Sequence, residues 1–144
     1  MTTYRSAVVH TTILAPPDTV AAFLGDLHNW TAWAPWVQSV TRSSPRDWTL
    51  ETESGALKFR FGESNAFGIL DHDVTLPFGE TVTNSMRVVP NGAGSELVML
   101  LLQWPHLTSQ EFDRDVEAVT SDLARIKQVL ERQTSNDAVA GRDA

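Results

Sequence analysis

The feature that most constrains the fold is one long amphipathic segment, residues 108–132. Its apolar side chains recur at steps of three and four, which places them in one stripe along a helix. Thr108 and Glu111 have the spacing of a capping box, so we expect the helix to begin there. At about 1.5 Å per residue the helix would run roughly 35 Å, and its stripe must be buried against something of similar length. The stripe consists of Phe112, Val116, Val119, Leu123, Ile126 and Leu130.

The chain before this helix offers mainly strands. Residues 4–14 alternate and are rich in β-branched side chains, which predicts a first strand ended by the prolines at 16–17. Two short helical segments follow, and the second carries three tryptophans. Six further strands are predicted at residues 37–43, 48–53, 57–61, 67–76, 80–89 and 96–104.

The short connections between these strands favour antiparallel pairing. A curved, antiparallel, seven-stranded sheet around the long C-terminal helix is the simple arrangement that buries the apolar faces of both. We therefore predict an α+β fold, with two short helices after strand 1. Residues 1–132 would form a single domain, and the small, polar residues 133–144 a disordered C-terminal tail.

Composition excludes several classes of function. The net charge of −7 argues against nucleic acid and anionic membrane as partners. No apolar run approaches the ~20 residues of a spanning helix, so we expect no integral membrane association. The N-terminus has no signal-peptide apolar segment and the chain has no cysteine, which fits a cytoplasmic protein. No phosphate-binding or dinucleotide fingerprint occurs, and no cofactor is predicted.

A cavity is expected between the sheet and the helix. The side chains that strand parity points inward are mainly apolar, with polar exceptions at His72, Asn84 and Gln103. This is the usual composition of a small-molecule site. The residues predicted to bind a ligand are Trp30, Trp36, Phe59, Phe61, Asn84, Met86, Met99, Gln103, Phe112 and Val116.

His72 is the candidate for chemistry. It shares a strand face with Leu70 and Val74, so it should point inward, where a neutral imidazole can act as a base or bind a ligand oxygen. The alternative is a core histidine satisfied by a neighbouring polar group. Asp71 and Asp73 point to the opposite face, which argues against a catalytic triad and against a metal cluster.

The other polar and aromatic candidates also have two interpretations. Asn84 and Gln103 need partners for both amide atoms, which a ligand, ordered water or each other could supply. Trp30 and Trp36 could stack on a flat ligand at the entrance of the cavity, or simply cover the core.

The sequence resembles the START and birch-pollen-allergen-like superfamily, often called SRPBCC, over residues 4–132. The resemblance lies in the segment 15–20 that leads into the first helix, and in Asp26 followed by Trp30, Trp33 and Pro35. Residues 71–77 and 86–92 resemble an uncharacterised bacterial branch that is described as polyketide-cyclase-like.

This resemblance implies a helix-grip fold and three kinds of function. The first is binding of a hydrophobic or aromatic small molecule. The second is an enzyme of polyketide cyclase, aromatase or dehydratase type, with His72 as acid or base. The third is a protein-interaction or co-chaperone-like module, which an apolar outer face at Val98, Leu100 and Leu102 would favour and which would suit a homodimer.

Overall fold

The computed structural model describes residues 2–143, and side chains up to residue 137. Seven strands and two α-helices, with one 3₁₀ helix, follow one another along the chain. Their bounds are β1 Ser6–Ile13, α1 Pro17–Gly25, η1 Leu27–Ala32, β2 Ser39–Arg42, β3 Asp47–Thr52, β4 Gly55–Phe61, β5 His72–Thr75, β6 Thr81–Asn91, β7 Gly94–Leu102 and α2 Ser109–Asp143.

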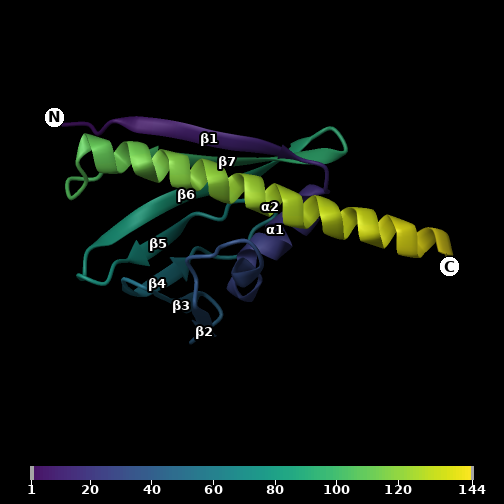
Figure 1. Ribbon diagram of the computed structural model, residues 1–144, viewed down its shortest axis with the longest axis horizontal. Coiled ribbons are helices and arrows are strands. Elements are labelled where there is room, and N and C mark those ends of the chain that lie inside the picture. Colours follow the sequence, from purple (N-terminus) through teal and green to yellow (C-terminus); the bar gives the residue numbers. More distant parts are fainter. Residues whose placement is uncertain (1, 144) are drawn as a thin grey trace.

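The seven strands form one antiparallel sheet in the order β1-β7-β6-β5-β4-β3-β2. Strands β2 to β7 are joined as consecutive hairpins, and β1 pairs with β7 from Ser6 opposite Leu102 to Ile13 opposite Ser95. In Figure 1, α2 lies beside β1 and β7, while β4, β3 and β2 curve away from it. The predicted helix-grip architecture, with a curved antiparallel sheet around the terminal helix, is confirmed.

Strand alternation explains where the core lies. In β3, Trp48 and Leu50 are buried, with exposed fractions of 3% and 0%, while Thr49 between them is only half-buried. Phe59 and Phe61 are the buried positions of the neighbouring strand β4. One face of the sheet is therefore apolar and the other polar, which is the pattern of a sheet covered on one side.

The helix α2 covers that apolar face. The predicted capping box is confirmed, because Thr108 N donates to Glu111 Oε1 at 3.1 Å and Glu111 N donates to Thr108 Oγ1 at 3.1 Å. Further along, Lys127 Nζ donates to the Thr12 carbonyl oxygen at 2.6 Å. The core-facing residues Leu123, Ile126 and Leu130 are at most 2% exposed.

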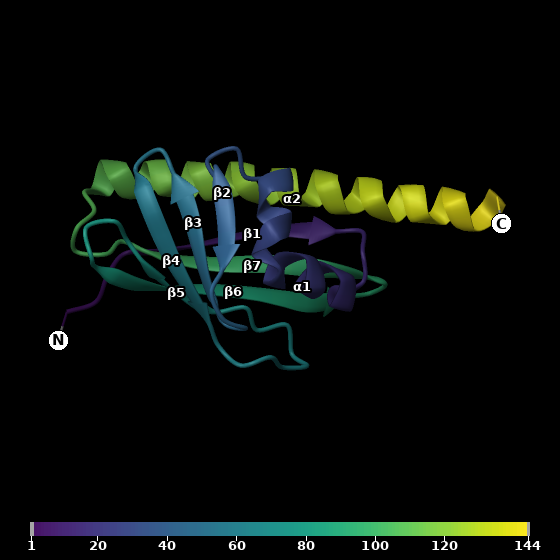
Figure 2. The same ribbon diagram turned by 90° about the horizontal axis from the view of Figure 1, so that it is seen from below.

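The helix extends further than predicted. It runs to Asp143 and projects past the end of the sheet, as Figure 2 shows, so the expected disordered tail is helical over residues 133–143. The small, polar composition of this stretch suggested disorder, but no proline interrupts it, and an established helix adds each further residue at little cost. Thr134 Oγ1 also donates to the Leu130 carbonyl oxygen at 3.0 Å.

The fifth strand is shorter than predicted. Regular pairing in β5 begins only at His72, and the preceding residues form a loop. Gly68 in this loop has a φ of 69°, and a Cβ at that position would lie 2.2 Å from the Val88 carbonyl oxygen. The side chain of Asn65 accepts from the Phe67 and Ile69 amides, which supports the loop as an alternative to strand pairing.

The outer face of the sheet carries some apolar surface. Leu100 on β7 is 40% exposed and lies in register with Val8 on β1, which is 62% exposed. Val98 and Leu102, which were also expected to face outward, are half-buried. The homodimer suggested by this face stays a prediction.

Candidate functional site

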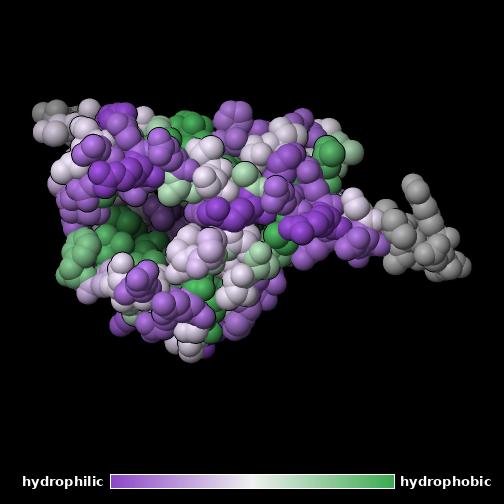
Figure 3. Space-filling view, viewed as in Figure 1, coloured by the Kyte–Doolittle hydropathy of each residue, from purple (hydrophilic) through white to green (hydrophobic). Residues whose placement is uncertain are grey.

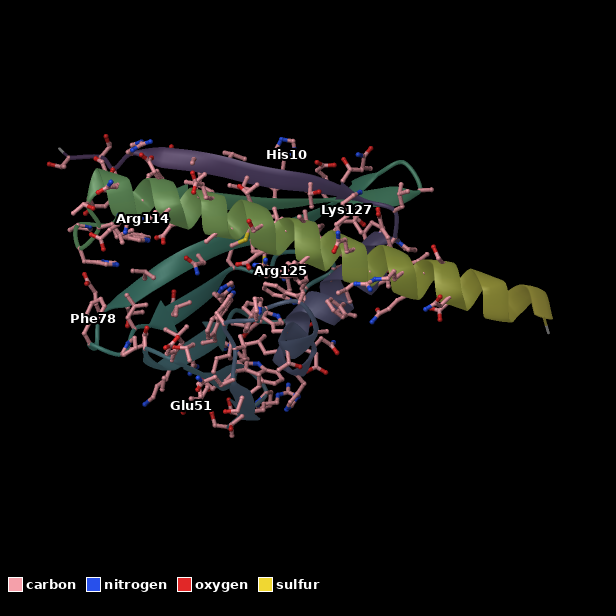
Figure 4. All side chains as sticks on the ribbon, in the orientation of Figure 1. His10, Glu51, Phe78, Arg114, Arg125 and Lys127 are labelled. Carbon is pink, nitrogen blue, oxygen red and sulfur yellow. The ribbon has the colours of Figure 1, made fainter. Side chains whose placement is uncertain are left out.

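A cavity of ≈ 300 Å³ lies between α2 and the concave face of the sheet. Figure 3 shows this face of the molecule hollowed between α2 and the apolar surface around the β5–β6 turn, and Figure 4 places Phe78 on that turn. The wall is mainly apolar. Among the aromatic and apolar residues that line it are Trp30, Trp33, Trp36, Leu57, Phe59, Val74, Leu76, Val82, Met86, Met99, Leu101, Trp104, Leu107, Phe112, Ala118, Val119, Leu123 and Ile126.

His72 is the most buried polar residue of the wall, with an exposed fraction of 3%. Its Nδ1 lies 2.8 Å from the Leu70 carbonyl oxygen. Since a carbonyl oxygen can only accept, Nδ1 carries the proton and Nε2 keeps a lone pair. Burial lowers the pKa of His72 below its ordinary 6.5, although the Leu70 carbonyl opposes this shift. The imidazole is therefore a neutral hydrogen-bond acceptor at Nε2.

Aromatic rings hold this imidazole in place. The Phe59 ring stacks on it with centroids 5.3 Å apart, and the Phe61 ring lies 4.9 Å away. The Trp30 ring lies edge-on to it, with the two ring centroids 6.3 Å apart. Because the ring is confined on several sides, the direction in which Nε2 can accept a hydrogen bond is limited.

The carboxylates beside His72 face the other side of the sheet, as strand alternation predicts. Asp71 accepts from Arg87 Nη2 at 2.9 Å and from the Met86 amide at 3.0 Å. The hydrogen bond from Arg87 is the main reason that the pKa of Asp71 is lowered. Asp73 accepts from Thr83 Oγ1 at 2.7 Å. Neither carboxylate can orient the imidazole as in a catalytic triad.

The three tryptophans line one side of the cavity. Trp30 is 5% exposed and its Nε1 donates to the Leu24 carbonyl oxygen at 3.0 Å. Trp36 is half-buried and its Nε1 donates to Asp122 Oδ1 at 3.3 Å. Trp33 Nε1 is buried and has no hydrogen-bond partner within the described part of the chain.

Two carboxylates of α2 also border the cavity, the exposed Asp115 and the half-buried Asp122. Burial raises the pKa of Asp122, while hydrogen bonds from Arg125, 2.6 Å away, and from Trp36 oppose the shift. Desolvation, with the nearby charge of Glu111, raises the pKa of Asp115. The sequence spacing indicates this position, because residues 115, 119, 122 and 126 are four, three and four apart and therefore share one helix face.

His106, in the loop before α2, is a further lining residue. Its Nδ1 lies 3.3 Å from Glu80 Oε2, and its ring lies 5.5 Å from that of Phe78. These two contacts connect the loop before α2 with the β5–β6 turn.

Most of the residues predicted to bind a ligand lie in the cavity wall, and three do not. Phe61 backs His72 from outside the wall. Val116 is half-buried on α2 without reaching the cavity. Gln103 instead donates from Nε2 to the Leu107 carbonyl oxygen at 3.2 Å. The predicted residues that do line the cavity are Trp30, Trp36, Phe59, His72, Asn84, Met86, Met99 and Phe112, and their part in binding stays a prediction.

Over residues 2–137, whose side chains the structure describes, no group of three or more histidine, aspartate or glutamate side chains is arranged to hold a metal ion. None of the helices in the described range has both the length and the apolar character needed to cross a membrane.

Solved structures share this fold. The Zhui aromatase/cyclase from Streptomyces is 18% identical with a TM-score of 0.69, and the match covers 90% of this chain and 95% of that one. A START superfamily protein from Mycobacterium smegmatis is 12% identical with a TM-score of 0.71, covering 89% and 98%. The Aha1 dimer from Colwellia psychrerythraea is 12% identical with a TM-score of 0.73, covering 88% and 96%. At such identities the likeness concerns the fold alone.

The comparison with curated protein sequences found no match. A family model described as "Polyketide cyclase / dehydrase and lipid transport" matches residues 5–132, from the start of the sheet through the core-facing part of α2. The START/SRPBCC resemblance inferred from the tryptophan-rich segment is thereby confirmed, and the chain belongs to the polyketide cyclase/dehydrase and lipid transport family.

Proposed function

We propose that this protein binds an apolar small molecule with an aromatic ring in the cavity between α2 and the sheet. The observation that carries the proposal is the wall itself, which is mainly apolar with few polar groups. Its volume of ≈ 300 Å³ lies at the lower end of the range of about 300–1,000 Å³ that is typical of ligand pockets. A molecule of two or three fused rings fits this size better than a long lipid chain.

The tryptophans support an aromatic ligand. Trp36 is half-buried in the wall, and its ring lies 6.2 Å from Trp33 and 6.3 Å from Trp30. Flat rings in the wall can stack against a flat guest or contact it edge-on, and such contacts add to the free energy of burial. They also give a direct signal, because a bound ring changes the fluorescence of the tryptophans that it touches.

A cavity-blocking substitution tests the proposal. Val119 and Val129 are both half-buried valines of α2, but only Val119 lines the cavity. We expect wild type and Val129→Trp to bind 2-naphthol, seen as a change in tryptophan fluorescence and a raised melting temperature. Val119→Trp should lose both effects while remaining folded by circular dichroism. Equal binding by Val119→Trp and wild type would show that the ligand sits elsewhere.

A second candidate is an enzyme that acts on the bound molecule, with His72 as the general base. The tautomer set by the Leu70 carbonyl favours this candidate, because it leaves an unprotonated Nε2 on a buried residue of the cavity wall. A general base of this kind contributes about 10²–10⁴-fold to the rate.

The enzyme candidate is tested on cyclisation-prone poly-β-keto model substrates with wild type and His72→Ala, following the aromatic product by absorbance. Val88→Ala serves as a control for loss of core packing, because Val88 is buried but lies outside the cavity wall. We expect turnover to fall by about 10²-fold or more in His72→Ala only. Unchanged turnover in that variant would remove His72 from the chemistry.

A further inference from the structure

The polar groups of the cavity wall include acceptors without a full set of donors, at His72 and Asp122, and one buried donor without a partner, Trp33 Nε1. His72 Nε2 has a lone pair and no hydrogen-bond partner among the described residues, although the residue is only 3% exposed. A buried acceptor that is left unpaired costs free energy, so a ligand that donates to it is favoured.

The two carboxylates of α2 extend this pattern. Asp122 Oδ1 accepts from Trp36 and Arg125, but its Oδ2 has no partner in the described part of the chain. Asp115 borders the same cavity at its exposed edge, and neither of its oxygens has a hydrogen-bond partner among the same residues. His72 and Asp122 therefore each have an acceptor atom that a ligand donor can pair with, whereas water can pair with Asp115.

Positive charge is scarce in this wall, which contains no lysine or arginine. Two guanidiniums lie beside wall residues, and both are already paired. Arg125 donates from Nη2 and Nε to Asp122 and to the Trp33 carbonyl oxygen. Arg5, 5.0 Å from the Phe112 ring centroid, donates to Asp113 Oδ1. Figure 4 shows Arg125 on α2. At the other end of the wall, His106 lies 3.3 Å from the carboxylate of Glu80, which offsets any charge that it gains. The side-chain amide of Asn84 can both donate and accept, so it does not favour either a donor or an acceptor on the ligand.

From these groups we propose that the ligand is an uncharged or cationic ring compound that presents a hydroxyl or ammonium donor to the acceptors of the wall. Carboxylate and phosphate compounds should bind more weakly. An anion entering this cavity would lose its water shell near Asp122 and meet one neutral N–H, Trp33 Nε1, but no unpaired guanidinium, and the protein carries a net charge of −7. This inference rests on the proposed binding function and narrows its ligand class.

Four naphthalene probes with the same ring and different substituents test the inference at pH 7. They are 2-methylnaphthalene, 2-naphthylmethanol, 2-naphthylmethylamine and 2-naphthoate. Dissociation constants come from tryptophan fluorescence and isothermal titration calorimetry. We expect the alcohol and the amine to bind about tenfold more tightly than the methyl compound, which corresponds to about one net hydrogen bond. The naphthoate should bind more weakly than the methyl compound.

Charge variants test the cause of this ranking. In Asp122→Asn we expect naphthoate to gain affinity by about tenfold, and the amine to lose a similar factor. Asp115→Asn should have a smaller effect in the same direction, because Asp115 is exposed. Glu117→Gln is the matched control, because Glu117 is exposed on the same helix, lies outside the wall and carries the same charge. It should leave the ranking of the four probes unchanged.

The outcomes separate this inference from the proposed function. If naphthoate binds wild type as tightly as the alcohol does, the inference that the cavity prefers hydrogen-bond donors is overturned, while the cavity is still a ligand site. If the alcohol and the amine bind no more tightly than the methyl compound, the same inference is overturned. If none of the four probes binds, the proposed function falls, and this inference falls with it. The wild-type ranking decides the question even if an Asp variant does not fold.

Discussion

Shortening Leu123 to alanine should cost less stability than the same change at Leu130. Both leucines belong to the apolar stripe of α2 and are at most 2% exposed, but only Leu123 lines the cavity. Each substitution removes three carbon atoms, which is about 2.4 kcal/mol of transfer free energy at about 0.8 kcal/mol per CH₂. At Leu130 the change also opens a closed void, which brings the expected loss to about 4–5 kcal/mol.

At Leu123 the new space joins the existing hollow, so fewer packing contacts are lost and water or a ligand can fill it. We expect a loss of about 3 kcal/mol there. Urea unfolding followed by circular dichroism measures both values, with the slope against urea unchanged. The larger cavity of Leu123→Ala should also bind anthracen-2-ol more tightly than wild type does. Equal losses at the two positions, with no change in ligand affinity, would refute the claim that the cavity reaches Leu123.

Three further predictions concern single groups. Burial lowers the pKa of His72 in the folded state, so the unfolded chain takes up the proton first as pH falls through about 6.5. The wild-type protein should therefore lose stability over this pH range. In His72→Gln the unfolding free energy should depend less steeply on pH. Gly68→Ala should lower the unfolding free energy by more than 2 kcal/mol, because the new Cβ would lie 2.2 Å from the Val88 carbonyl oxygen. At Gly92 a Cβ would meet nothing within 4 Å, so Gly92→Ala should cost only about 1 kcal/mol. Thermal unfolding measures both losses. Thr108→Ala removes half of the capping box and should cost about 1 kcal/mol by urea titration; no loss would show that solvent caps the helix equally well.

The architecture could be predicted from the sequence because it depends on patterns that repeat. A stripe of period 3.6 must be buried, and alternation of period two decides which face of a strand is covered. These two rules place Leu123 and Leu130 in the core, turn His72 inward and send Asp71 outward. They need no knowledge of distant contacts.

Strand alternation and helix periodicity do not extend past the ends of the strands and helices, so the sequence alone could not place residues there. Gln103 follows the last residue of β7, where the backbone turns and Trp104 N donates to the Leu102 carbonyl oxygen at 3.0 Å, so strand parity no longer applies. Phe61 ends β4 beside the loop that replaces the start of the predicted fifth strand. The same limit applies beyond Arg132, where helix propagation and not composition set the length of α2.

The sequence by itself determined the fold class, the buried stripe and the inward position of His72, because each follows from local periodicity. Only the tertiary structure decided which side chains border the cavity and that Asp115 and Asp122 are among them. A helix side chain at the edge of an apolar stripe is exposed or enclosed according to how far the facing sheet curves away. That curvature is set by contacts between residues distant in the chain, and no local pattern records it.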